Sequence, residues 1–169
     1  AMDINRDAAP MAVSVLGECK YRSPLKLKKI SKSADEDGFV PETARIRFDI
    51  ESNAGHPTSD ILFEKAGPRE KLFFDPAKTR AAIVTCGGLC PGLNSVIRSV
   101  FCELFHNYGV RELLGIRYGY LGLNPESGLE PVRLDGDMVD RIHREGGTIL
   151  GSSRGNQPIG LMADFLAKN

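Results

Sequence analysis

Residues 80–98 place a strand-like run, a pair of glycines and a helix start directly after one another. Residues 81–86 form a short apolar run with several β-branched side chains, which predicts a central strand buried on both faces of a parallel sheet. Gly87 and Gly88 permit a sharp turn and a close approach of the backbone to a ligand, and Pro91 suits the first turn of a helix. This order is typical of α/β folds, in which the chain passes from a sheet into a covering helix.

Apolar residues then recur with a helical period and predict a helix over residues 93–107. The free N–H groups and the positive dipole end of such a helix favour an anion, so we expect a phosphate or a carboxylate over Gly88. The alternative is an ordinary strand–helix turn whose glycines serve geometry alone. The stretch matches neither G-x-x-x-x-G-K-[ST] nor G-x-G-x-x-G, so the common phosphate motifs do not decide between the two.

A second strand is predicted over residues 110–117, after Gly109 at the position of a C′ glycine. A strand, a helix and a strand at this spacing make a parallel unit with a right-handed connection. The ligand crevice of such folds lies at the carboxyl ends of the strands, which brings Gly87, Gly88 and residues 118–122 to one edge.

The rest of the chain is predicted to form more helices than a sheet of so few strands can cover. Residues 129–134 read as a small edge strand, Asp135 caps a helix over residues 136–145, and Pro158 opens a last helix. Two parallel strands make a poor sheet for three helices, so we expect a continuation of the chain. The fold class is therefore predicted as α/β, the N-terminal part of a doubly wound, mostly parallel, Rossmann-like sheet.

A second loop with anion-binding character spans residues 146–155, where glycines and hydroxyls end on Arg154. Glycines allow close approach, hydroxyls donate to oxygen atoms, and a guanidinium can grip two phosphate oxygens at once. Taken alone, the loop could equally be a turn with a surface arginine. Two such turns in one half of the chain favour a phosphate ligand.

The first part of the chain reads as an irregular extension over residues 1–78, placed before the α/β domain at residues 79–169. Within it, residues 45–50 alternate like a half-exposed strand, residues 53–59 form a loop and residues 71–74 form a short strand or a docking segment. A basic cluster could hold a phosphorylated ligand or a partner chain, or it could be a solvated surface; its members are Lys20, Arg22, Lys26, Lys28, Lys29 and Lys32.

The composition of the chain argues against several classes of protein. Lys and Arg number 22 and Asp and Glu number 22, and this balance argues against a general nucleic-acid or membrane-surface binder. No apolar stretch approaches a membrane-spanning length or resembles a signal peptide, so we expect a cytoplasmic protein. The four cysteines lack metal-ligand spacing, and we interpret them as small buried apolar residues rather than a redox pair.

Three motifs in this order resemble those of the 6-phosphofructokinases. Residues 85–94 are similar to the family's first phosphate turn, residues 119–123 to its second-strand exit, and residues 146–155 to its nucleotide-contacting loop. The resemblance covers about residues 67–169. It is greatest to the long plant and protist form, which is mostly ATP-dependent and has pyrophosphate-dependent relatives.

The resemblance implies roles for single residues. Gly88 is similar to the glycine whose N–H meets the terminal phosphates of the nucleotide, and Arg154, with Gly155 beside it, resembles the arginine that contacts the transferring phosphate. Tyr120 resembles a tyrosine of the adenosine pocket. The resemblance thus implies ATP and Mg²⁺ as cofactors, fructose 6-phosphate as partner and a homotetramer.

Two departures separate the chain from the short bacterial form. Leu89 stands where that form has aspartate after the glycine pair. Arg98 matches the first of two effector-binding arginines, but Cys102 stands at the second, so Arg98 could equally be an exposed helix arginine.

The resemblance also places important parts of the enzyme beyond Asn169. They are the Gly-Gly-Asp-Gly segment that helps to hold magnesium, the catalytic aspartate that acts as the general base, and most of the sugar-phosphate site. The sequence therefore predicts an N-terminal fragment of an ATP-dependent, glycolytic 6-phosphofructokinase that is inactive alone. The alternatives are a pyrophosphate-dependent phosphotransferase and a non-catalytic nucleotide-binding regulatory subunit.

Overall fold

A computed structural model of the chain describes residues 14–27, 38–49, 51 and 61–169. Contacts divide it into two compact units, Ala1–Phe74 and Asp75–Asn169, and each is described here by itself. The loop expected at residues 53–59 and three members of the basic cluster, Lys28, Lys29 and Lys32, lie outside the described residues.

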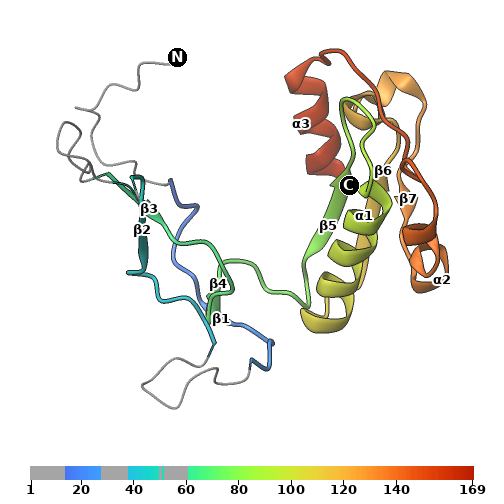
Figure 1. The fold of residues 1–169 in the computed structure, drawn as a ribbon. Coiled ribbons are helices and arrows are strands. Elements are labelled where there is room, and N and C mark those ends of the chain that lie inside the picture. Colours follow the sequence, from blue (N-terminus) through green and yellow to red (C-terminus); the bar gives the residue numbers. More distant parts are fainter. Residues whose placement is uncertain (1–13, 28–37, 50, 52–60) are drawn as a thin grey trace. The chain divides into compact units, whose positions relative to one another are not determined.

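The first unit contains two short antiparallel ribbons (Figure 1). Strand β1 (Tyr21–Arg22) pairs with β4 (Lys71–Leu72), and β2 (Arg45–Arg47) pairs with β3 (Leu62–Glu64). The strands predicted over residues 45–50 and 71–74 are therefore present but shorter. Since isolated two-stranded ribbons are marginally stable in water, other contacts must hold this unit together.

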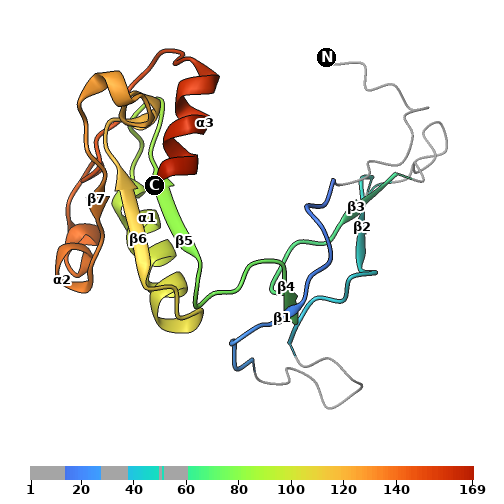
Figure 2. The ribbon, with the colours of Figure 1, turned by 180° about the vertical axis from the view of Figure 1, so that it is seen from behind.

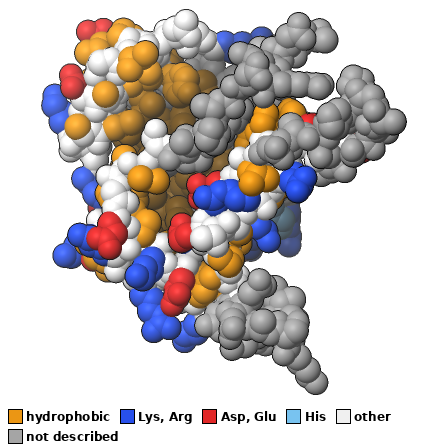
Figure 3. All heavy atoms as spheres, turned by 90° about the vertical axis from the view of Figure 1, so that its left-hand side faces the viewer, with side chains coloured by type: hydrophobic (Ala, Val, Ile, Leu, Met, Phe, Trp, Pro, Cys, Tyr) orange, Lys and Arg blue, Asp and Glu red, His pale blue; other side chains and the backbone are white. Residues whose placement is uncertain are grey.

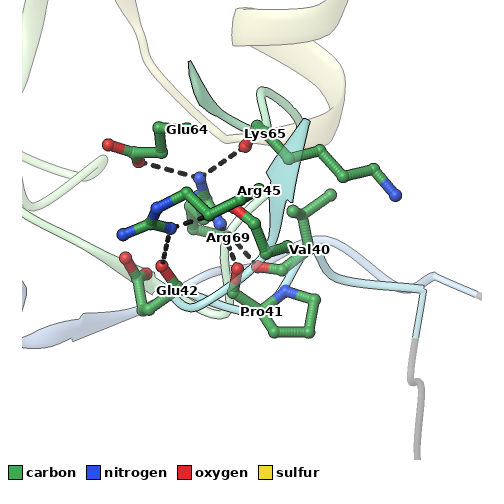
Figure 4. A network of polar contacts seen from close by, with 8 residues as sticks. Val40, Pro41, Glu42, Arg45, Glu64, Lys65 and Arg69 are labelled. Atoms are coloured by element: carbon green, nitrogen blue, oxygen red, sulfur yellow. Dashed lines mark hydrogen bonds and ion pairs between the residues drawn. The ribbon is translucent and has the colours of Figure 1, made fainter. Parts of the chain in front are cut away.

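One such contact set is centred on Arg69, whose side chain is only 16% exposed. Figure 4 shows its guanidinium between two loops. It donates to the carbonyl oxygens of Val40 at 2.9 Å, Pro41 at 2.7 Å and Lys65 at 2.6 Å, and to the Glu64 carboxylate at 2.9 Å. The fork of donors on one arginine thereby joins the segment before β2 to the end of β3.

The second unit is built on a three-stranded sheet in the order β5-β6-β7. Strand β5 (Arg80–Val84) runs parallel to β6 (Glu112–Ile116), and β7 (Val132–Arg133) pairs antiparallel with β6. An α/β fold with a parallel strand pair is thus confirmed, in a mixed sheet whose small edge strand is β7.

The prediction of a central strand buried on both faces is wrong for β5. Within the described residues β6 is the middle strand, and exposure alternates along β5, with Val84 39% exposed. The reason is that only Ala81 and Ile83 pack against the core cluster. Strand β6 instead buries Leu113 on one side and Ile116 on the other.

Helix α1 (Leu93–Cys102) continues as a π-helical turn at Glu103–Asn107, so the helix predicted over residues 93–107 is present with a wider last turn. It ends before Gly109, whose φ of 77° is the left-handed conformation expected of a C′ glycine. Pro91 precedes the N-cap residue Gly92 instead of lying in the first turn.

The remaining helices are short apart from α3. They are 3₁₀ helices at Gly119–Leu123, Pro125–Ser127 and Ile142–Arg144, helix α2 (Gly136–Val139), and α3 (Ile159–Lys168), which follows Pro158. Figures 1 and 2 show α1 on one face of the sheet in both views.

The single helix predicted over residues 136–145 is wrong, although its cap is confirmed. Asp135 Oδ1 accepts a hydrogen bond from the Met138 N–H at 2.8 Å. The helix stops after Val139, and the carbonyl of Asp140 accepts a hydrogen bond from Arg98 Nε at 3.3 Å. Arg98 lies on α1, so this bond joins the end of α2 to α1, and the chain continues in a separate 3₁₀ helix whose Ile142 is buried in the core.

The core forms two clusters. The larger lies between α1 and the sheet, and its buried residues are Ile97, Phe101, Val110, Leu113, Leu134, Val139, Ile142 and Leu150. The smaller cluster joins Ile116 of β6 to Leu123 and to Phe165 of α3. The two clusters fix the positions of the loops that leave the sheet.

Charged side chains of both signs are interspersed on the molecular face drawn in Figure 3. Within the described residues, no helix combines the length and the apolar character needed to cross a bilayer.

Candidate functional site

A cavity of about 490 Å³ lies between the turn after β5 and the glycine-rich loop after residue 145. Both loops supply residues to its wall, which consists of Gly87, Gly88, Leu89, Gly146, Gly147, Thr148, Gly151, Ser152, Ser153 and Arg154. The two segments that the sequence singled out for anion binding therefore share one cavity.

Gly88 and Arg154 lie against each other in this cavity. A Cβ atom built on Gly88 would stand 3.3 Å from Nη2 of Arg154, tighter than most such contacts. Among the described residues, neither the N–H of Gly88 nor the guanidinium of Arg154 has a hydrogen-bond or ion-pair partner. Both residues line the same cavity, so an anion there could accept from donors that have no partner among the described residues.

Hydrogen bonds join the two loops directly. The Gly87 N–H donates to the Ser153 carbonyl at 3.1 Å, and the Ser152 hydroxyl donates to the Gly87 carbonyl at 2.6 Å. The left-handed φ of 92° at Gly87 makes this turn one that favours glycine. The reciprocal pair of bonds fixes Ser153, the residue before Arg154, against the turn.

Two buried polar side chains reinforce the junction. Asn94, 2% exposed, donates from Nδ2 to the Glu145 carbonyl at 3.1 Å and accepts at Oδ1 from the Ile149 N–H at 2.8 Å. Thr85, 8% exposed, has its hydroxyl 2.7 Å from the Gly151 carbonyl oxygen. Thr85 thus joins the start of the first motif, and Asn94 its end, to the glycine-rich loop and the residue before it.

The third motif reaches the same junction. A Cβ on Gly119 would lie 3.0 Å from Ser153 Oγ and 3.1 Å from Cys86 Sγ. The N–H of Tyr118 donates to the Leu150 carbonyl at 2.7 Å. All three motifs that carry the family resemblance therefore meet at one end of the β5–β6 pair.

Other predicted site residues lie elsewhere. Tyr120 is 44% exposed in the 3₁₀ helix Gly119–Leu123, and neither it nor Gly155 lines the cavity. Arg98 is engaged with Asp140. The first turn of α1 does not line the cavity either, so the wall is made by the two loops rather than by the helix N-terminus.

The prediction of buried cysteines is wrong. Cys86 and Cys90 are exposed, and Cys19 and Cys102 are partly exposed. Cys86 comes after the last residue of β5, where the chain has left the sheet, and its thiol lies 3.6 Å from the Ser153 carbonyl.

The sequence interpretation missed Thr85 and Asn94 as supports of the loop, and it assigned the loop hydroxyls to a ligand. In the structure the hydroxyls of Thr148 and Ser152 bond to the protein itself. A polar residue inside an otherwise apolar pattern could have identified both supports. Thr85 lies within the apolar run of residues 81–86, and Asn94 falls on the helix face that carries Ile97 and Phe101.

The residues of the cavity fit an anionic group such as a phosphate. The missing side chain at Gly88 leaves a cradle beside a cation, and the donors there have no partner among the described residues. The described residues contain no cluster of three or more His, Cys, Asp or Glu side chains that could hold a metal ion.

Comparisons with known proteins agree with the three motifs. The family model described as "Phosphofructokinase" matches residues 80–165, just over half of the chain. An ATP-dependent 6-phosphofructokinase of Borreliella burgdorferi is 47% identical over 154 residues, covering 90% of this chain and 34% of the relative.

Two eukaryotic relatives give the same result. An ATP-dependent 6-phosphofructokinase of Trypanosoma brucei brucei is 40% identical over 98% of this chain and 33% of its own length. ATP-dependent 6-phosphofructokinase 1 of Arabidopsis thaliana is 46% identical over 72% of this chain and 24% of its own length. The chain spans about a third or less of these relatives, and by its motifs and its matched domain it belongs to the phosphofructokinase family.

Proposed function

We propose that this chain forms the donor-phosphate part of an ATP-dependent 6-phosphofructokinase, which transfers the terminal phosphate of ATP to the 1-hydroxyl of fructose 6-phosphate. The observation that carries the proposal is the contact of Gly88 with Arg154 on one cavity, in a chain of this family. The relatives named above are all called ATP-dependent, which favours ATP over pyrophosphate as donor.

The roles of the two residues follow from the chemistry. Phosphoryl transfer depends on positioning and on neutralising the charge of the equatorial oxygens of the transferring group. The Gly88 N–H orients the terminal phosphates, and the Arg154 guanidinium stabilises the charge that develops on the transferring phosphate. Magnesium, when bound, would neutralise part of the charge of the phosphates.

The remaining parts of the proposal concern residues and segments away from this contact. Tyr120 and Gly155 would contact the nucleotide, and Arg98 would bind an effector only if it leaves the Asp140 carbonyl. The general base and the magnesium ligands would come from outside residues 1–169. The complete domain would have a doubly wound sheet, and the protein would be a homotetramer. We therefore expect no turnover from the 169-residue chain alone.

The direct test is turnover of fructose 6-phosphate by the full-length protein with ATP and with pyrophosphate as separate donors. ATP-dependent formation of fructose 1,6-bisphosphate supports the proposal. Dominant pyrophosphate activity would assign the chain to the other donor, and nucleotide binding without turnover would assign it to a regulatory subunit.

The same assay on the purified 169-residue chain tests the inactivity of the fragment. Measurable turnover there would contradict the placement of the base outside this chain.

A further inference from the structure

Thr85 forms a hydrogen-bonded chain into the glycine-rich loop. Its hydroxyl oxygen lies 2.7 Å from the Gly151 carbonyl oxygen and 3.0 Å from the hydroxyl oxygen of Thr148. The Thr148 hydroxyl in turn accepts from the N–H of Leu150 at 3.2 Å. Thr85 is 8% exposed, so water has little access to replace these bonds.

The number of protons on each hydroxyl decides which group is the donor in each of these hydrogen bonds. A carbonyl oxygen can only accept, so the one proton of Thr85 goes to Gly151. Thr148 must then donate its own proton to Thr85, while its oxygen accepts from Leu150. All three donors point the same way along the chain of bonds, an arrangement in which each bond polarises the next.

The end of this chain of bonds lies three residues before Arg154. Gly151 has a left-handed φ of 69°, and a Cβ there would lie 2.7 Å from the Tyr118 ring. The backbone of Gly151 is therefore confined on its Cα side by Tyr118 and at its carbonyl by Thr85. From this fixed point the chain runs through Ser152 and Ser153 to the guanidinium beside Gly88.

We propose that Thr85 is a positioning residue for Arg154: its hydroxyl holds the Gly151 carbonyl and so sets the guanidinium beside Gly88. This inference rests on the proposed function for its kinetic consequences. It differs from a purely structural role, in which the Thr85 bond would stabilise the fold without acting through Arg154.

The test uses the full-length protein with Thr85→Val, which removes the hydroxyl at nearly constant shape, and Thr85→Ser, which keeps it. Turnover is measured in the wild type and in an Arg154→Ala background. We expect Thr85→Val to lower kcat about tenfold or more, because small misplacements of a catalytic group are costly. Thr85→Ser should stay within about threefold of the wild type, and Thr85→Val should cost nothing further once Arg154 is absent.

Thr79→Val supplies a matched control for lost stability. The Thr79 hydroxyl donates to the Asp75 carbonyl at 2.7 Å, the same bond length, at the opposite end of β5. It should lower the thermal midpoint, though less than Thr85→Val, because the Thr85 hydroxyl has a second bond to Thr148, and it should leave kcat unchanged. Equal losses of kcat from Thr85→Val in both backgrounds, or a wild-type kcat for Thr85→Val, would overturn the proposal.

A binding measurement separates this inference from the proposed function. Inorganic tripolyphosphate is titrated into each variant by calorimetry, and Thr85→Val should weaken its binding only when Arg154 is present. A full-length protein without phosphofructokinase activity but with this pattern would contradict the proposed function and keep the inference. If Thr85→Val does not fold, Thr148→Val removes two bonds of the chain, those with Thr85 and with the Leu150 N–H, and should show the same dependence on Arg154. A Thr148→Val effect that does not depend on Arg154 would overturn the proposal.

Discussion

Nη2 of Arg154 lies 3.3 Å from the position that a Cβ atom would occupy on Gly88. The two residues belong to different loops, and both lack partners among the described residues. Because Gly88 has no left-handed φ, its need for glycine is one of space and not of backbone conformation. The contact thus ties the identity of residue 88 to the cation opposite it.

Gly88→Ala is expected to fold normally and to lose function. The added methyl group meets the far end of a flexible side chain, which can move away at little cost in the free energy of unfolding. The moved guanidinium and the new methyl group together obstruct the phosphate, so turnover should fall by about 10²-fold or more. Turnover and urea denaturation of the full-length protein check both parts.

Gly160→Ala is the matched control, since a Cβ there meets nothing within 4 Å and the residue lies in α3. It should raise stability by up to about 1 kcal/mol, as alanine favours helix. A comparable loss of turnover in both variants would show that the effect of Gly88→Ala is not local.

Arg154→Ala should reduce kcat by about 10²- to 10³-fold, because a charge contact to the transition state is lost. The side chain is exposed, so the unfolding free energy should change by less than about 0.5 kcal/mol. Arg154→Lys keeps the charge without the planar fork and should recover only part of the loss. A near-normal kcat for Arg154→Ala would leave Arg154 as a surface residue.

Asn94→Ala should destabilise the protein by about 2 kcal/mol or more, because it leaves the Glu145 carbonyl and the Ile149 N–H without their partner. Asn107→Ala removes an exposed bond to the Glu103 carboxylate in the following turn and should cost less than about 0.5 kcal/mol. Urea denaturation of the two variants gives the comparison, and equal effects would contradict the role assigned to Asn94.

Arg69→Ala should loosen the first unit specifically. It removes four hydrogen bonds that join the two loops in Figure 4, and the local opening free energy should fall by about 2 kcal/mol. Arg45→Ala, whose bonds reach only the nearby Glu42 and Ala44 carbonyls, serves as control with a smaller effect. Amide exchange over residues 38–49 and 61–72 measures the difference.

Because of Tyr108, the folded protein should lose stability at high pH. Burial raises the pKa of its hydroxyl above the usual 10.0, and the negative charge of Glu103 raises it further. The folded state therefore holds this proton more tightly, so the contribution is complete below pH 10.0 and is lost as the pH rises through the folded pKa. Tyr108→Phe should remove this part of the pH dependence in urea denaturation, and an unchanged slope would contradict it.

The sequence predicted those parts of the fold that depend on local pattern. The parallel strand pair, the glycine at residue 109 and the Asp135 cap each follow from residues adjacent in the chain. The exposure of β5 could not be predicted, because burial depends on what packs against a strand and not on its own apolar run. At the break after Val139, Asp140 and Ile142 contact residues that are remote in sequence, and no local pattern shows these contacts.

In the candidate site, too, only the parts that depend on local pattern could be predicted. The glycine turn and the arginine loop were visible as patterns, whereas their junction depends on the side chains of Thr85 and Asn94. Both are single polar residues whose partners lie in the other loop, and no local pattern identifies such pairs.

A crystal structure of the full-length protein with a non-hydrolysable ATP analogue tests the donor-phosphate site most directly. The terminal phosphates should lie between the N–H of Gly88 and the guanidinium of Arg154, inside the cavity that both residues line. An analogue bound with its phosphates remote from both residues would contradict it.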